Sequence, residues 1–339
     1  MMLRYIIRRM MWLMFVLLGL CAITFILSRV VPGDPAAAYL GPRAKAEQIE
    51  RVRIQLGLDK PLYTQFFYYL RDLSRGNLGE SLRTHRPVMV GIIDHLPASL
   101  ELMFSAIFVS LLVGIPLGVI SAKKENTLVD HLIRLFSVAD VSLPSFWLAM
   151  IFQIVFFRWL GLFPIGGRID TVVGLMSPIE RITGLYVIDA LITGNWTAFK
   201  SALSHLVLPT ITLACFSMGL IARMTRSTML EVLREDYITT ARAVGVSENE
   251  ILFVQALKNA LGPTITTAGL SFAFMLTATL YIELIFFWPG IGSYITKAIF
   301  LNDYPVIMGV TMLMALFYVV VNLIVDLLIA VFDPRIRLG

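Results

Sequence analysis

The sequence predicts an all-α integral membrane protein, and its composition carries that prediction. Hydrophobic residues make up 58% of the 339 residues, charged residues only 15%, and the mean hydropathy is +0.80. A soluble domain is nearer to about 45–50% apolar and about 25% charged. The surplus apolar surface must therefore face lipid. Because lipid offers no partner for free backbone groups, each segment that crosses it is expected to be a helix.

Six windows are long and apolar enough to span a bilayer, since a crossing helix needs about 20 mainly apolar residues. The predicted spans are Met10–Val30, Leu100–Ala122, Leu135–Phe157, Leu203–Arg223, Thr264–Phe287 and Val306–Phe332. The first follows basic residues, as a signal peptide does, but it has no A-x-A-like cleavage site. It is therefore interpreted as an uncleaved helix.

Basic residues near the ends of the windows predict the orientation. One side receives arginines and lysines from the N-terminus, from the second and fourth connections and from the C-terminus, whereas the short fifth connection holds only Lys297. Both termini are therefore expected in the cytoplasm. The predicted layout is a first segment with its helix (1–31), an extracytoplasmic segment (32–97), a five-helix core (98–332) and a cytoplasmic tail (333–339).

Two outer segments interrupt the spans. In the first, Lys45–Leu56 and Gln65–Leu73 are expected to form short helices, and five aromatic residues between 63 and 69 give the second an aromatic face. That face suits a membrane interface or a dock for an external partner. The second outer segment, about 161–201, is expected to cap the mouth of a pathway.

The inner connection, 224–263, has the features of two helices joined at a glycine. Met229–Val244 is compatible with a helix that Gly245 ends. Ser247 with Glu250 has the spacing of a capping box for a second helix, which Gly262 and Pro263 are expected to close. The small side chains of Ala241 and Ala243 would let another protein approach the backbone. An amphipathic helix pair lying on the membrane is the alternative.

The order of the motifs resembles one family from end to end. The run from Glu235 to Gly245 (EDYITTARAVG), followed by ALKNALGP at 256–263, resembles the inner loop of dipeptide/oligopeptide-type ABC-transporter permeases. VPGDP at 31–35, RMTR at 223–226, WPGIG at 288–292 and DPRIR at 333–337 agree with a B-type subunit of such a system. The general ABC-importer loop motif is matched only at Ala241, Gly245 and Leu257.

The resemblance implies a type I ABC importer permease fold in a prokaryotic plasma membrane. It also implies partners: a second homologous permease, two cytoplasmic ATPase subunits and an extracytoplasmic binding protein. The expected cargo is short peptides, with nickel chelates, glutathione or oligosaccharides as alternatives. The residues that would contact an ATPase are Glu235, Asp236, Tyr237, Thr240, Ala241, Arg242, Ala243 and Gly245.

Ionisable residues inside spans are costly and are therefore functional candidates. Asp140 and Glu283 either line the pathway or form hydrogen bonds with polar groups of neighbouring helices. Asp326 is expected to be satisfied by neighbouring helices in the same way. Pro116, Pro144 and Pro209 lie within or near spans and are candidate kinks.

Other classes find little support. The sequence has no G-x-x-x-x-G-K-[ST] loop for ATP phosphates, no H-E-x-x-H metal motif and no G-x-S-x-G nucleophile elbow. No cofactor or metal is therefore expected on this chain, and ATP with Mg²⁺ would bind to the partner ATPases. The two cysteines cannot form a disulfide framework, and the placement of basic residues in connections does not indicate nucleic acid. An ion-coupled secondary transporter and an intramembrane hydrolase remain as rivals.

Overall fold

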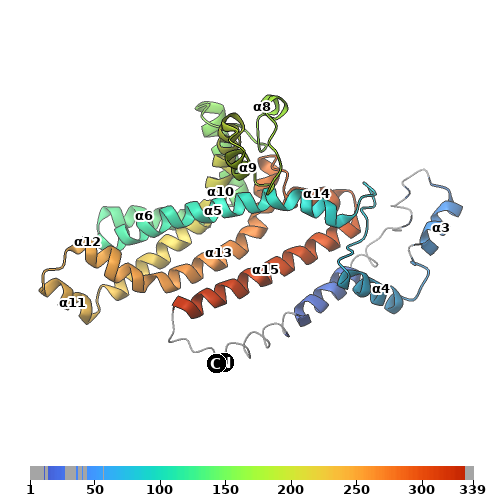
Figure 1. Cartoon of the computed structure of the whole chain (residues 1–339). Helices are drawn as coiled ribbons and strands as arrows, with labels where there is room; N and C mark the ends of the chain where they lie inside the picture. The colour runs from blue at the N-terminus through green and yellow to red at the C-terminus, as the bar shows by residue number, and fades with distance from the viewer. Residues whose placement is uncertain are drawn as a thin grey trace. The chain divides into compact units, whose positions relative to one another are not determined.

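The protein is described from a computed structural model, which covers residues 11, 14–26, 36, 40, 44–55 and 57–332. Within these residues every regular element is helical, apart from one isolated β-bridge between Glu80 and Pro87. The all-α prediction is therefore confirmed for the described part of the chain. Figure 1 shows the long helices that dominate it.

The chain divides into two compact units. One comprises residues 1–96, 290–319 and 338–339, and the other comprises residues 97–289 and 320–337. Helices α5 (Val88–Lys123) and α15 (Tyr304–Phe332) each contribute to both units.

In the first unit, the two predicted outer helices are present as α3 (Ala46–Gln55) and α4 (Leu62–Ser74). The aromatic face of α4 is divided between two environments. The ring centroid of Phe66 lies 5.2 Å from that of Phe25, which belongs to the apolar helix Met14–Ile26. Tyr63 and Phe67, by contrast, are exposed. For the exposed Tyr63 and Phe67, both predicted roles stay open: contact with the membrane interface and docking of an external partner.

Hydrogen bonds to buried polar side chains link further parts of this unit. The buried carboxylate of Asp303 accepts from the Ser81 hydroxyl at 2.5 Å and from the Leu82 backbone N–H at 3.1 Å. The buried amide of Gln65 donates to the carbonyls of Leu58 and Lys60. Helix α14 (Ile291–Phe300) completes the unit, and its Tyr294 ring stacks on His95.

In the second unit, α10 (Trp196–Val232) is the most deeply buried of the long apolar helices. It contacts α6 (Leu128–Ser142), α7 (Ser145–Phe152) and α13 (Leu257–Ile285) along its length, and α8 (Thr171–Met176) and α9 (Tyr186–Ile192) near its start. The inner connection lies at its other end (Figure 1). The second outer segment and the inner connection therefore lie at opposite ends of one helix.

Four of the six predicted windows are single helices long enough to cross a membrane. These are Val88–Lys123, Trp196–Val232, Glu248–Ile285 and Tyr304–Leu327. The first window is described at Met11 and over Met14–Ile26, and its ends lie outside the described residues. The third window, predicted as one helix, is interrupted, so the number of crossings stays a prediction.

The interruption of the third window has a clear cause. Helix α6 ends at Ser142, Leu143 has extended dihedrals, and Pro144 precedes α7. Because the proline ring disfavours helical geometry in the residue before it, the break falls where the sequence predicts a kink. Beyond α7 the chain continues as a π-helical segment, η1 (Gln153–Trp159).

The other prolines do not end their helices. Pro116 lies inside α5 and Pro209 inside α10. Pro263 lies inside α13, so the prediction that Gly262 and Pro263 close a helix was wrong. Glu248–Ile285 is one continuous helical stretch, with a π-helical segment η2 (Ile251–Ala256) near its start. A proline removes one backbone donor, and packing of α13 against α10 offsets that loss.

Close packing of α5 on α10 requires glycine. A Cβ placed on Gly118 would lie 2.5 Å from Thr225 Cβ and 2.6 Å from the Ala222 carbonyl oxygen. The neighbouring atoms include helix backbone, which cannot move aside cheaply. Gly118 therefore sets the separation of the two helices.

We predict that Gly118→Ala lowers the stability of the purified protein by about 1–3 kcal/mol, because overpacking forces the two helices apart. Thermal unfolding in detergent would measure the loss. Gly262→Ala is the matched control, since a Cβ there meets nothing within 4 Å. This control should unfold at the same temperature or higher; equal midpoints for both variants would refute the close approach.

Candidate functional site

The inner connection folds as the hinged helix pair that the sequence predicts, with one added turn. Helix α10 ends at Val232, and a turn over 233–235 separates it from α11 (Asp236–Ala243). The continuous helix predicted over Met229–Val244 is therefore interrupted. Glu235 caps the new helix with extended dihedrals, and Asp236 lies in its first turn. Both carboxylates stabilise the positive end of the helix dipole.

Gly245 ends α11 as predicted. Its φ is +86°, in the left-handed region that favours glycine. The Gly245 N–H donates to the Arg242 carbonyl and the Val246 N–H to the Ala241 carbonyl, both at 3.1 Å. These two bonds form a Schellman motif. The conformation of Gly245 is thus a requirement of the helix end.

The predicted cap of the second helix is also present. The Ser247 hydroxyl oxygen accepts from the Glu250 backbone N–H at 3.3 Å, at the start of α12 (Glu248–Glu250). From there the chain runs without interruption to Ile285. The loop is therefore a short helix joined through Gly245 directly to a membrane-spanning helix.

One face of α11 is buried in the protein's own core. Ile238 is fully buried and Ala241 is 9% exposed. They belong to a cluster that we call the loop core, whose members come from α5, α10, α11, η2 and α13: Val119, Ala122, Met229, Ile238, Ala241, Ile251, Leu252, Ala256 and Ala260. Ala241 is therefore largely covered by the protein's own residues, and its contact with another protein stays a prediction. Its small side chain allows α11 to lie close to the core.

The other predicted contact residues of α11 are exposed. This face consists of Glu235, Asp236, Tyr237, Thr240, Arg242 and Ala243, and we call it the α11 face. Two polar contacts fix it to the following helix. The Asn259 amide donates to the Tyr237 hydroxyl at 2.7 Å, and Arg242 Nε lies 2.8 Å from Glu248 Oε1.

A buried ion pair lies beside the loop core. Asp130, on α6, is fully buried and accepts from Arg226 Nε at 2.7 Å and Arg226 Nη2 at 2.8 Å. The Ser121 hydroxyl and the Asn126 backbone N–H also donate to it. Arg226 holds the pKa of the Asp130 carboxyl well below its ordinary range, with help from Ser121 and Asn126 and against the opposing effect of burial. Three elements, α5, α6 and α10, therefore meet at one carboxylate.

A second buried ion pair fixes the outer segment to α5. Arg168 lies 2.5 Å from Glu101 Oε2, and both side chains are almost fully buried. The Arg168 guanidinium also lies over the ring of Tyr186, 3.7 Å from its centroid, and Glu101 accepts from the Val187 N–H. These bonds hold the segment 161–201 against the bundle. Its role as a cap over a pathway stays a prediction.

A neighbouring carboxylate, Asp189, organises the same segment internally. It accepts from the backbone N–H groups of Ile182, Thr183 and Gly184 and from the Thr183 hydroxyl. Burial acts to raise the Asp189 pKa, but these hydrogen bonds outweigh it and lower the pKa. Asp189 is therefore stabilised as an anion.

The two pathway candidates have different outcomes. Glu283 is fully buried in α13 and accepts from the Ser99 hydroxyl at 2.5 Å. This environment agrees with satisfaction by neighbouring helices. The backbone of Asp140 is part of α6, but its side chain lies outside the described residues. A pathway role for either residue stays untested.

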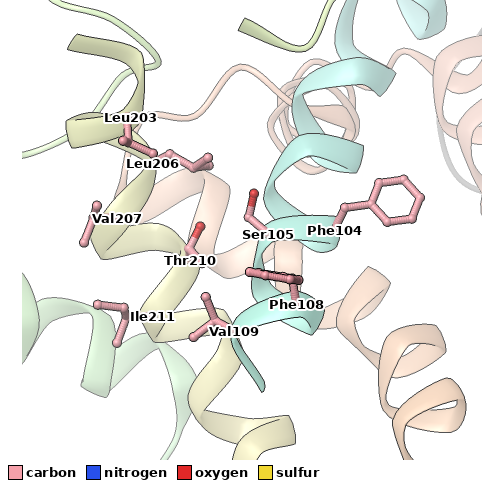
Figure 2. A pocket seen from close by; sticks show the side chains of 9 residues that line it. All are labelled: Phe104, Ser105, Phe108, Val109, Leu203, Leu206, Val207, Thr210 and Ile211. Atoms are coloured by element: carbon pink, nitrogen blue, oxygen red, sulfur yellow. The ribbon is translucent and has the colours of Figure 1, made fainter. Parts of the chain in front are cut away.

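A groove between α5 and α10 is a further feature that sequence reasoning did not locate (Figure 2). It measures about 550 Å³ and is lined mainly by apolar side chains, including Phe104, Phe108 and Leu206. The buried Thr210 hydroxyl lines it and has no hydrogen-bond partner among the residues that the structure describes. The groove therefore suits an uncharged, largely apolar group.

Sequence reasoning missed Asp130, Glu101 and Arg168. Glu101 lies inside the second apolar window, so its charge is a visible signal there. Asp130 and Arg168 lie in polar connections, where single charges are common. Only their partners, far along the chain, show that they are structural.

We predict that Arg226→Met destabilises the protein by about 3–5 kcal/mol, because it leaves the buried Asp130 carboxylate unpaired. The double variant Asp130→Asn with Arg226→Met should recover part of the loss. Thermal unfolding in detergent measures both variants. The pairing would be contradicted if the double variant lost as much stability as the single variants Arg226→Met and Asp130→Asn together.

The pH dependence of the same variants follows from the lowered pKa of Asp130. A depressed folded-state pKa contributes stability above the unfolded value of about 4, and that contribution is lost as the pH falls through the folded-state pKa. The temperature at which half of the unchanged protein is unfolded should therefore decrease once the pH drops below about 4. The unfolding temperature of Asp130→Asn should decrease less over the same pH range.

Comparison with known proteins matches these features to a family. A family model described as "Binding-protein-dependent transport system inner membrane component" matches residues 114–338, and a model of the N-terminal region of the same membrane component matches residues 2–103. A probable D,D-dipeptide transport system permease protein of Escherichia coli is 45% identical over 98% of each chain. A dipeptide transport system permease protein of Alkalihalophilus pseudofirmus is 42% identical over 99% of this chain and 100% of its own.

A di/tripeptide transport system permease protein of Pseudomonas aeruginosa is also 42% identical, over 99% of each chain. The matches span both described units and both ends of the bundle. The chain belongs to the family of binding-protein-dependent transport system inner membrane components, and it is a multi-pass permease of the bacterial plasma membrane.

Proposed function

We propose that this chain is one of two permease subunits of an ATP-driven importer of short peptides. The observation that carries this proposal is the α11 face, which is exposed while the opposite side of the same short helix is built into the core. The printed names of the relatives, which are permeases for dipeptides, D,D-dipeptides and di- or tripeptides, support the cargo class. Nickel chelates, glutathione or oligosaccharides are the alternative cargoes.

The α11 face is the proposed contact with a cytoplasmic ATPase subunit. The sequence lacks a phosphate-binding loop, so ATP and Mg²⁺ would be held by two partner subunits. Exposed apolar side chains in the same loop, Tyr237, Val244 and Phe253, provide surface that association would bury. A folded, capped helix also loses little conformational entropy when it docks.

Force applied to α11 has two routes into the bundle. The first is the loop core, where Ile238 and Ala241 are in a cluster with residues of α5, α10 and α13. The second is polar, through Tyr237 to Asn259 and Arg242 to Glu248. Because packed interiors are not continuously deformable, a displacement of α11 is expected to move the adjoining helices as a body.

The proposed cargo route is uncharged. The groove between α5 and α10 is mainly apolar, and its polar lining groups are the hydroxyls of Ser105 and Thr210. Varied peptides require weak contacts, because a strong site would retain one of them. Selectivity would then belong to an external binding protein, which the family description names as part of the system.

The proposed topology has six crossings with both termini in the cytoplasm. Four long helices support it, together with the shorter apolar helices Met14–Ile26 and Ser145–Trp159. Basic residues near the ends of the spans favour a cytoplasmic position for the inner connection. The segment 161–201 would then lie outside.

A secondary transporter driven by an ion gradient is the rival from another class. Such transporters commonly have broken helices and ionisable groups near the midplane. Here Glu283 is buried and hydrogen-bonded to Ser99. Uptake by the purified chain alone, driven by a proton gradient in liposomes, would favour the rival.

We predict that Ala243→Asp reduces ATP-driven uptake at least about tenfold while leaving the amount of protein in the membrane unchanged. The residue is exposed at the end of α11, so a buried charge would arise only when a partner docks. The measurement is uptake by vesicles that contain the complete complex, with ATP hydrolysis recorded in parallel.

The structure also selects the controls for this experiment. Ala241→Asp and Gly245→Asp are poor probes, because the first charges the loop core and the second strains a helix end at φ +86°. Lys258→Asp changes charge at another exposed position of the same connection and should transport normally. Normal uptake by Ala243→Asp at normal abundance would refute the docking role.

We predict that a cysteine at Ala243 reacts with a membrane-impermeant maleimide only from the cytoplasmic side, and one at Met176 only from outside. Both positions are exposed, and Met176 is 85% exposed. The natural cysteines, Cys21 and Cys215, are buried, so background labelling should be low. Labelling of Ala243→Cys in intact cells would overturn the orientation.

A further inference from the structure

A basic pocket lies between α6 and α10, beside the Asp130–Arg226 pair. Its volume is about 260 Å³. Three arginines, Arg134, Arg223 and Arg226, line it together with apolar side chains that include Ile133 and Val138. The pocket therefore combines positive charge with an apolar wall.

The charges around the pocket do not cancel. Arg226 directs two nitrogens at the Asp130 carboxylate. Arg134 Nε lies 3.7 Å from the same carboxylate, which is beyond hydrogen-bond distance, and Arg134 also contacts the His131 ring. Arg223 is exposed and has no ion pair among the residues that the structure describes. Arg226 thus neutralises Asp130, whereas the charges of Arg134 and Arg223 remain largely unbalanced.

No carboxylate is among the described residues that line the pocket. Glu125 is paired with Arg234 at 3.4 Å, outside the pocket lining. Lys123 and Lys124 are exposed and lie outside the pocket lining. Arginine forks fit phosphate oxygens in pairs, so the unbalanced charge favours a phosphate group.

The surroundings of the pocket favour a lipid as the source of that phosphate. Leu132, Leu135 and Phe136 are exposed on α6 next to the pocket-lining Ile133 and Arg134. A free anion or an acidic protein surface would leave this apolar side uncovered. An acyl chain would cover it.

The depth of the arginines agrees with a headgroup. Arg134 lies six residues after the start of α6 at Leu128, which corresponds to about 9 Å along the helix axis. The polar layer of one leaflet is about 5–8 Å thick, and arginine side chains reach outward to it. The guanidinium group can therefore meet a headgroup phosphate while the helix faces the acyl chain.

We propose that this pocket binds the phosphate of an anionic phospholipid of the cytoplasmic leaflet, through Arg134 and Arg223. The exposed Ser227 hydroxyl lines the same pocket and can donate a further hydrogen bond. The acyl chain lies along Leu132 and Leu135 of α6. The bound lipid bridges α6 and α10 at the level of Asp130. The proposal rests on the inner-side orientation given above.

The test uses the full chain, purified and stripped of lipid, in titrations followed by native mass spectrometry. Dioleoyl phosphatidylglycerol and dioleoyl phosphatidylcholine share acyl chains and differ in headgroup charge. The unchanged chain should prefer the anionic lipid. The double variant Arg134→Gln with Arg223→Gln should bind it at least about tenfold more weakly, since each basic residue contributes measurably to anionic-lipid affinity.

The matched control is Lys124→Gln with Lys258→Gln, which removes the same charge from exposed positions outside the pocket lining. It should keep its affinity within about twofold, a small change on the affinity scale. Both double variants retain the Asp130–Arg226 pair, and their unfolding temperatures report whether they are folded.

Four outcomes would overturn the proposal. The first is equal binding of the two lipids, and the second is an equal loss of affinity in the control variant. The third is full displacement of the lipid by inorganic phosphate at the same concentration. The fourth is that the arginine variant loses its co-purifying ATPase subunits while its lipid binding is unchanged. The third outcome identifies a free-anion site, and the fourth identifies an acidic protein partner. Neither of these depends on transport activity, so failure here is distinct from failure of the proposed importer function.

Discussion

The burial of Ile238 and Ala241 in the loop core is the contact on which the inner end of the bundle depends. An eight-residue helix is too short to be stable alone in water, so α11 needs tertiary packing. Burying the Ile238 side chain contributes about 1.5–3 kcal/mol. The Schellman bonds at Gly245 then fix the direction in which the chain leaves the helix. One side of α11 is thereby committed to the protein and the other is left exposed.

Two buried ion pairs have a corresponding role at two levels of α5. Glu101 meets Arg168 near its outer part, and Asp130 meets Arg226 beside its inner end, where Ser121 of α5 donates to the same carboxylate. A buried ion pair adds little net stability over an apolar replacement, but breaking one is costly. These pairs therefore act mainly to specify which segments meet. The connections at both ends are held in place, while the apolar middle of the bundle contains the groove beside Thr210.

Local signals in the sequence were sufficient where the determinant is local. Gly245 and the Ser247 cap each depend on a few neighbouring residues and appear at their expected positions, and Pro144 interrupts the helix where only a kink was a candidate. Apolar windows likewise predicted the long helices. The sequence did not reveal which face of α11 is buried, because Ala241 and Ala243 are equally small and only contacts with α5 and η2 distinguish them. Nor did it reveal the ion pairs, whose members are 67 and 96 residues apart.

The error at Pro263 shows how far a local rule extends in a membrane protein. Proline ends helices in water because the freed carbonyl is solvated and the chain can turn away. Inside a bundle, turning away would expose several backbone groups to lipid, and each unsatisfied group costs several kcal/mol in hydrocarbon. Keeping the helix loses only one hydrogen bond, so α13 continues through Pro263 to Ile285. The same balance makes α12, η2 and α13 one continuous helical stretch, so the proposed contact at α11 would act on a long apolar helix that has no break.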